Sequence, residues 1–157
     1  MQLGRPALAD ELAERVARYG VSPQRIQFEV AEDVLGADVA RLADQLTRLR
    51  EHGFRVALDD FGAGNTALTW LRRLPIDTLK LDRAFAATLA EPATRTIVRS
   101  ILQLARDLGV RTVAEGVETA EQLAFFTDAG CDFTQGYLHG CPAPADAVWP
   151  PPGGVLR

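Results

Sequence analysis

The chain has 157 residues, a net charge of −4 and an apolar fraction of 47%. This length suits one domain, which we place at residues 1–157, and the composition excludes a disordered or collagen-like chain. The acidic balance argues against a general DNA or RNA binder and against a polybasic membrane-surface protein. The first 20 residues carry Asp10, Glu11 and Glu14 rather than the apolar core of a signal peptide or membrane anchor, so we expect a cytoplasmic protein.

Apolar residues alternate between helical and strand spacing along most of the chain. Gly53 and Gly109 mark the ends of two helices, Pro75 ends a third, and Thr119 with Gln122 forms the capping-box pattern that begins another. In chain order, the pattern predicts a helix from residue 8 to 19, a strand at 26–30, a helix at about 38–52, a strand at 54–58, a glycine-containing loop at 61–65, a short helix at about 66–74, a strand at 78–81, a helix around 97–108, a strand at 111–114, a helix at 119–129, a strand at 133–138 and a proline-rich tail from residue 142.

Five strands that alternate with helices predict an α/β fold with a parallel sheet, because right-handed crossovers join parallel strands through helices. The carboxyl ends of such strands meet at one rim, where the sites of α/β proteins are built. Every predicted strand ends in polar residues. In chain order these are Glu29 and Glu32, Asp59 and Asp60, Lys80 and Asp82, Glu115 and Glu118, and Gln135.

Several carboxylates directed at one rim repel one another unless cations bind between them. Oxygen ligands without clustered His or Cys favour Mg²⁺ or Mn²⁺ over zinc. Two such ions suit displacement at a phosphodiester, with Lys80, the only lysine of the chain, steadying the attacking oxygen. For any single acidic residue the alternative is a helix cap or a solvated loop group, but recurrence at five strand ends favours a site.

Five segments resemble motifs of one known family. They are Phe28-Glu29-Val30-Ala31-Glu32, Asp59-Asp60-Phe61-Gly62-Ala63-Gly64, Lys80-Leu81-Asp82-Arg83, Glu115-Gly116-Val117-Glu118 and Gln135-Gly136-Tyr137-Leu138. In order and spacing, across about residues 20–142, they are similar to the E-x-T-E, DDFGTG, KIDR, EGVE and QGYL motifs of the EAL domain. That family is a bacterial TIM-type barrel of second-messenger signalling, which hydrolyses cyclic di-GMP to a linear dinucleotide.

The resemblance implies a role for each matching residue and a pair of Mg²⁺ or Mn²⁺ ions as cofactor, with cyclic di-GMP as the ligand. The substrate-binding residues stay unassigned. The implied metal ligands are Glu29, Asp59 and Asp60, the implied catalytic residues are Lys80, Glu115 and Gln135, and Glu32 is implied to support the loop that follows Asp60.

The chain also departs from the family pattern. The Glu-Ala-Leu strand with its metal-binding Glu is absent, and Gln2 is the nearest match to the metal-binding Asn of the next strand. We therefore expect about five of the usual eight strands, forming a partial barrel that leaves two edges and an apolar interior uncovered. A second copy, a partner protein, or the first helix and the proline-rich tail would then cover them. Hydrolysis should then be weak or absent. The alternative is a non-catalytic nucleotide-binding or protein-interaction module.

The two cysteines and His52 are predicted to have structural rather than catalytic roles. Cys131 and Cys141 lack metal-site spacing and form no disulfide framework, so we expect both to be reduced. His52 lies before Gly53 at a predicted helix end, where it would interact with the helix dipole.

Overall fold

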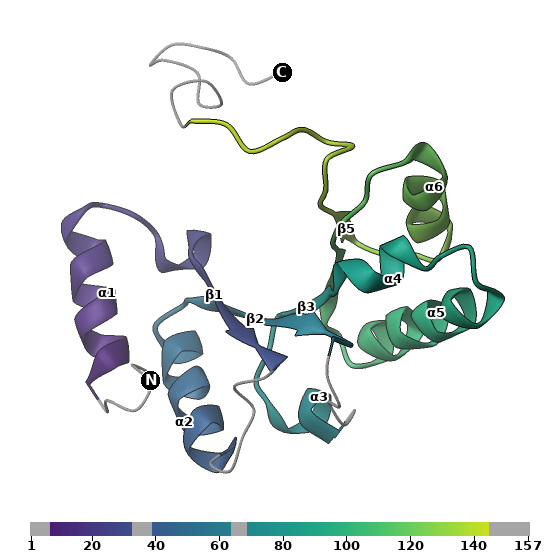
Figure 1. Cartoon of the computed structure of the whole chain (residues 1–157). Coiled ribbons are helices and arrows are strands. Elements are labelled where there is room, and N and C mark those ends of the chain that lie inside the picture. The colour runs from purple at the N-terminus through teal and green to yellow at the C-terminus, as the bar shows by residue number, and fades with distance from the viewer. Residues whose placement is uncertain (1–6, 33–38, 64–68, 145–157) are drawn as a thin grey trace.

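The computed structural model describes residues 7–32, 39–63 and 69–144, in which helices and strands alternate. Figure 1 shows α2, α3 and α5 on the same side of the central sheet. In chain order the elements are α1 (Leu8–Arg18), the 3-10 helix η2 (Pro23–Arg25), β1 (Gln27–Ala31), α2 (Val39–Glu51), β2 (Arg55–Phe61), α3 (Thr69–Arg73), β3 (Thr78–Leu81), α4 (Arg83–Ala87), α5 (Pro92–Asp107), β4 (Arg111–Ala114), α6 (Ala120–Asp128) and β5 (Phe133–Thr134).

The sheet contains five parallel strands in the order β1-β2-β3-β4-β5. Each strand pairs with its neighbour in the sequence, so the connections between them return across the same face, as in one wall of a barrel. The predicted α/β class and the parallel five-stranded sheet are confirmed. Within the described residues β1 and β5 are the edges, and cover by a second copy or a partner protein stays a prediction.

The face of the sheet toward the helices forms the hydrophobic core. Val56 and Leu58 of β2 and Leu79 of β3 are fully buried on this face, because alternate residues of a strand point to the same side. Leu46 and Leu49 of α2 and Val98 and Leu102 of α5 complete it from the helices.

The opposite, inner face is largely polar. It carries the alternate positions of each strand, among them Gln27, Arg55 and Lys80, and Thr78 Oγ1 donates a hydrogen bond of 3.2 Å to Gln27 Oε1 across β1 to β3. We expected an uncovered apolar interior, and that expectation is wrong for most of this face. Apolar exposure is found at the β5 edge, where Phe133 is 54% exposed.

Several element boundaries differ from the prediction. β2 continues to Phe61 rather than ending at residue 58, so the acidic pair lies inside the strand. β5 ends at Thr134 rather than at residue 138, because the chain turns there, with His139 N–H donating to the Gly136 carbonyl at 3.0 Å. α5 begins at Pro92, well before residue 97, since proline suits the first turn of a helix. Of the short helix predicted at 66–74, the part at 66–68 lies outside the described residues.

Two local features were not resolved by the sequence pattern. The short helix α4 was not predicted; Asp82 caps it by accepting a hydrogen bond of 2.8 Å from Ala84 N–H. His52 does not simply face the end of its helix, since its Nε2 lies 2.8 Å from Asp10 Oδ1 and so joins α2 to α1.

The capping box of Thr119 and Gln122 is present as predicted. In the part of the chain that the structure describes, no helix is both long and apolar enough to cross a membrane.

The two cysteines are free, as predicted, and differ in exposure. Burial raises the pKa of the Cys131 thiol, whose Sγ also lies 3.1 Å from the Phe133 carbonyl, whereas Cys141 is exposed. Since the thiolate is the reactive form, we predict that iodoacetamide modifies Cys131 about tenfold more slowly than Cys141 in the native chain. Peptide mass spectrometry measures both rates, which should converge in concentrated urea. Equal rates in the native protein would contradict this prediction.

Candidate functional site

An irregularity in β2 brings two adjacent carboxylates to one rim. The register between β2 and β3 shifts between Leu58 and Phe61, and Asp60 between them has a φ of +54°. Adjacent residues of a regular strand point to opposite faces, but a bulge re-aims one of them. Aspartate tolerates this left-handed backbone better than most residues. The bulge therefore lets Asp59 and Asp60 act together.

Glu115 adds a third carboxylate from two strands away. It follows β4 directly, and its backbone N–H donates a hydrogen bond of 3.1 Å to the Leu81 carbonyl at the end of β3. One carboxylate oxygen each from Asp59, Asp60 and Glu115 lie within 4.8 Å of one another. The rim thus gathers three potential metal ligands from two separate strands.

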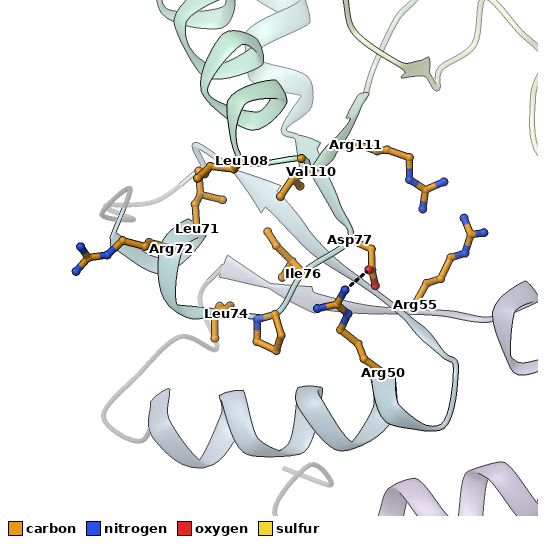
Figure 2. A pocket seen from close by; sticks show the side chains of 12 residues that line it. Arg50, Arg55, Leu71, Arg72, Leu74, Ile76, Asp77, Leu108, Val110 and Arg111 are labelled. Carbon is orange, nitrogen blue, oxygen red and sulfur yellow. Dashed lines mark ion pairs between the residues drawn. The ribbon is translucent and has the colours of Figure 1, made fainter.

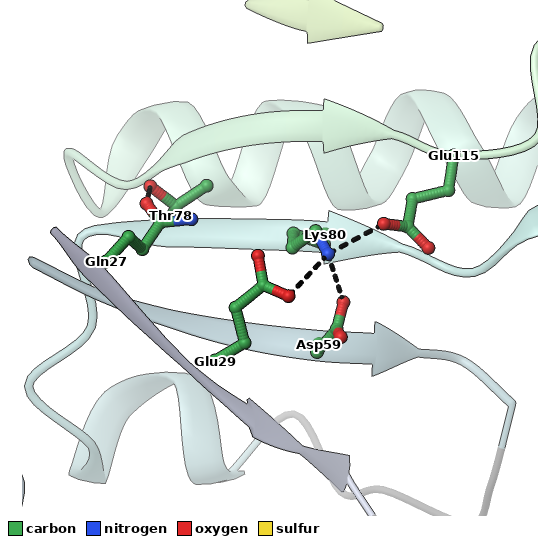
Figure 3. A network of polar contacts seen from close by, with 6 residues as sticks. All are labelled: Gln27, Glu29, Asp59, Thr78, Lys80 and Glu115. Carbon is green, nitrogen blue, oxygen red and sulfur yellow. Dashed lines mark hydrogen bonds and ion pairs between the residues drawn. The ribbon is translucent and has the colours of Figure 1, made fainter. Parts of the chain in front are cut away.

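Lys80 is the cation that these strands enclose. Its Nζ lies 2.7 Å from Asp59 Oδ1, 2.7 Å from Glu115 Oε1 and 3.0 Å from Glu29 Oε2 (Figure 3). Only 8% of the lysine side chain is exposed. Burial by itself lowers the pKa of Lys80, but the three carboxylates together outweigh burial and hold that pKa above its ordinary value. The ammonium therefore stays charged at neutral pH and cannot accept a proton.

The chemistry of the donors fits a hard divalent cation. Asp59 Oδ1 is buried and makes no hydrogen bond of good geometry; its close contact is the Lys80 ammonium. A buried carboxylate oxygen with unused acceptor capacity beside two more carboxylates favours a cation, and an all-oxygen set favours Mg²⁺ or Mn²⁺. Asp59, Asp60 and Glu115 are the residues that could hold it.

The structure groups the predicted metal ligands differently from the sequence. Glu29 contacts Lys80 but is not part of the cluster formed by Asp59, Asp60 and Glu115, and 44% of its side chain is exposed. Glu115, which we expected among the catalytic residues, lies with the two aspartates. The register of the sheet decides this grouping, because β1 is separated from β4 by two strands.

Glu32 holds the loop that follows Asp60 by a hydrogen bond to its backbone. Glu32 is 7% exposed, and its Oε2 accepts a hydrogen bond of 2.8 Å from Gly62 N–H. Gly62 has a φ of +98°, and a Cβ at this position would collide with the ring of Phe85. Glu32, Gly62 and Phe85 together fix the backbone conformation at the end of β2. They therefore also fix where the side chains of the two aspartates point.

Other rim residues take structural positions. Gln135 is exposed on the turn after β5, and its backbone carbonyl accepts a hydrogen bond of 3.0 Å from Val117 N–H. Its backbone N–H also donates a hydrogen bond of 2.8 Å to the Ala114 carbonyl, so the backbone of Gln135 extends the pairing with the β4 side of the sheet. Glu118 is exposed and its backbone N–H donates to Gln122 Oε1. Gln2 and Asn65 lie outside the described residues.

The comparisons with known proteins agree with this geometry. The EAL domain family model matches residues 1–142. An uncharacterized signaling protein of Caulobacter vibrioides is 42% identical over 94% of this chain and 18% of its own length. The cyclic di-GMP phosphodiesterase NbdA of Pseudomonas aeruginosa is 40% identical over 93% of this chain and 19% of its own length. The chain therefore belongs to the EAL domain family, and it spans about a fifth of these two relatives.

Solved structures show the same fold. The EAL domain of Mycobacterium smegmatis DcpA superposes with a TM-score of 0.88 at 35% identity, covering 94% of this chain and 66% of that one. Klebsiella pneumoniae BlrP1, solved with manganese and cyclic di-GMP, gives a TM-score of 0.80 at 31% identity, covering 85% of this chain and 34% of that one. The sheet described above is thus part of an EAL-type barrel.

Replacing Gly62 tests the support of the acidic bulge. We predict that Gly62→Ala lowers the free energy of unfolding by about 2 to 3 kcal/mol, because alanine is strained at this φ and displaces the Phe85 ring. Gly109→Ala is the matched control: Gly109 has a φ of +70° but no atom within 4 Å of an added Cβ, so about 1 kcal/mol should be lost. Urea denaturation measures both. Equal losses would show that Phe85 does not constrain the loop.

Replacing Lys80 tests the charge balance of the rim. In EDTA, Lys80→Gln should lower the unfolding free energy by about 2 kcal/mol, since it leaves three carboxylates without their shared cation while partial exposure tempers the loss. Mg²⁺ should restore part of it. Arg18→Gln, in an exposed pair with Glu14, should change little. Urea denaturation of each variant with and without Mg²⁺ measures these differences.

The difference in unfolding free energy between the native chain and Lys80→Gln depends on pH through the raised pKa of Lys80. Stabilisation by a group whose pKa is raised on folding is fully present below the pKa of the unfolded lysine and is lost only as the pH rises through the folded value. The gap between the native chain and Lys80→Gln should therefore stay constant across neutral pH. A Lys80→Gln chain as stable as the native one in EDTA would contradict the charge-balance account.

Proposed function

We propose that this chain supplies the metal-binding and phosphodiester-binding rim of an EAL domain that acts on cyclic di-GMP, giving a linear dinucleotide. The observation that carries the proposal is the enclosure of Lys80 by carboxylates from three strands, beside the cluster of Asp59, Asp60 and Glu115. The similarity to NbdA, a cyclic di-GMP phosphodiesterase, and to BlrP1 in complex with manganese and cyclic di-GMP supports it.

The carboxylates have the metal-holding role. Asp59, Asp60 and Glu115 would hold a divalent cation, and the buried Oδ1 of Asp59, which makes no hydrogen bond of good geometry, supports Asp59 as one of its ligands. Glu29 contacts the same ammonium and would be a ligand of the second ion that the family resemblance implies. A bound Mg²⁺ or Mn²⁺ supplies Lewis-acid polarisation of the phosphodiester. Glu32 keeps the bulge in place through Gly62.

The attacking water needs one group that positions it and another that accepts its proton. Lys80 stays protonated, so it would steady the attacking water once a bound cation takes over one of its carboxylate contacts, and its charge would offset the negative charge that develops on the phosphate oxygens. The base that accepts the proton of that water would be a carboxylate, and the contact of Glu115 with Lys80 Nζ at 2.7 Å supports Glu115 in that role as the alternative to metal binding. For Gln135, whose side chain is exposed on the turn after β5, support of the water and metal shell stays a prediction from the family resemblance.

We propose that binding exceeds turnover in this chain. These 157 residues by themselves do not include the Glu of the Glu-Ala-Leu motif, which the family resemblance implies as a metal ligand. Hydrolysis that needs two correctly placed ions loses orders of magnitude when one is poorly held. A chain that binds cyclic di-GMP without cleaving it would act as a nucleotide-binding module of the same signalling system.

Incubation with cyclic di-GMP and Mn²⁺ or Mg²⁺, followed by chromatography of the linear product, tests this function. We expect slow, metal-dependent product formation that falls by about 100-fold or more in Asp59→Ala, since that variant loses one of the metal ligands. Asp107→Ala, an exposed aspartate of α5 bonded to Gln103, is the matched control and should keep the native rate. Product that forms in EDTA, or equally in Asp59→Ala, would contradict the proposed site. Metal-dependent binding without product would identify the non-catalytic module.

A further inference from the structure

A positively charged pocket lies where β2, β3 and β4 begin, at the end of the sheet opposite the carboxylate rim (Figure 2). It measures about 680 Å³. Four of its lining residues are arginines, and Asp77 is its one acidic lining residue among those the structure describes. Four guanidinium groups and one carboxylate give a local charge of +3 in a chain whose net charge is −4. The arginines are Arg50, Arg55, Arg72 and Arg111.

Asp77 neutralises only one of these arginines. Its Oδ1 lies 2.9 Å from an Nη of Arg50, and its Oδ2 accepts a hydrogen bond of 2.9 Å from Val56 N–H. Both oxygens are therefore engaged. Arg111 reaches only a hydroxyl, Thr78 Oγ1 at 3.5 Å, and in the described part of the chain Arg55 has no side-chain hydrogen bond or ion pair. Among the described residues, Arg55 and Arg111 are thus left without a carboxylate partner, as is the exposed Arg72.

The sheet register places these two arginines on the same face. Ala57 of β2 is opposite Thr78 of β3, and Thr78 is opposite Arg111 of β4. Arg55 lies two residues before Ala57, so the side chains of Arg55 and Arg111 share the inner face. In Figure 2 the guanidinium groups of Arg55 and Arg111 lie near each other, on the side of Asp77 away from the labelled apolar side chains. Like charges held together in this way favour an anion between them.

Apolar side chains form the other wall of the pocket. Leu71, Leu74 and Ile76 line it and are at most 7% exposed, and Val110 continues this wall from the loop before β4. A volume of this size is in the range that binds small organic ligands, whereas a bare ion would leave most of it to solvent. The pocket therefore joins an anion-binding side to an apolar side.

We propose that this pocket binds a small molecule of nucleotide size, with its phosphate on Arg55 and Arg111 and its flat, apolar part against Ile76 and Val110. A guanidinium fork matches two phosphate oxygens at once, and two forks suit a dianionic group. The site shares no residue with the carboxylate rim and depends on no divalent metal, so it stands whether or not the rim hydrolyses cyclic di-GMP.

Isothermal titration calorimetry of the whole chain in EDTA tests the proposal with adenosine 5′-monophosphate as the probe. EDTA removes any contribution of a metal at the carboxylate rim. We expect saturable binding that weakens as NaCl is added, and affinity about tenfold lower in Arg55→Gln and in Arg111→Gln, since each removes one charge-assisted contact. Arg18→Gln, an arginine on α1 whose side chain is 79% exposed, is the matched control and should bind as the native chain does.

Three ligands separate the two halves of the proposal. Adenosine, which lacks the phosphate, and inorganic phosphate, which lacks the apolar part, should each bind more weakly than the monophosphate. Adenosine that bound as tightly as the monophosphate would overturn the role of Arg55 and Arg111, as would unchanged affinity in both variants. Phosphate that bound as tightly would overturn the role of the apolar wall. A tetraglutamate peptide that bound more tightly than the monophosphate would overturn the proposal in favour of an acidic partner protein.

Discussion

The buried ammonium of Lys80 is the interaction on which the rest of the site depends. Carboxylates from β1, β2 and the end of β4 contact it, so the charge of one side chain connects three strands and the fourth that carries it. Three carboxylates around one cation leave two negative charges uncompensated, and this imbalance is the electrostatic reason for a divalent ion at the rim. The same contacts keep the lysine protonated, which excludes it as a base and leaves proton transfer to a carboxylate.

A second constraint is the backbone of β2. Two adjacent aspartates reach one site only because the strand breaks its register at Asp60, and that break persists because Glu32 and the Phe85 ring hold the glycine that follows. Backbone strain at a functional position is stable only where the surroundings enforce it. The length of this segment is therefore constrained, because one residue more or fewer would turn a carboxylate away from the rim.

The two ends of the sheet carry opposite charge although the whole chain is acidic. Carboxylates gather where the strands end, and arginines gather where β2, β3 and β4 begin. The inner face between them is mostly polar, so the sheet need not bury this face to stay folded, and its hydrophobic stability comes from the side packed by α2 and α5. A partner that covers the inner face would have to meet polar groups as well as the exposed Phe133.

The alternation of strands and helices, the parallel sheet, the polar strand ends and the EAL resemblance could be predicted from the amino-acid sequence, because periodicity, glycine positions and motifs are local properties of the chain. It also identified Lys80, as the only lysine, and Glu32. Only the tertiary structure decided that Glu115 rather than Glu29 lies with the two aspartates, that β2 contains a bulge, and that Arg55 and Arg111 share a pocket with Ile76. These facts depend on strand register and on contacts between segments tens of residues apart, which no local pattern contains.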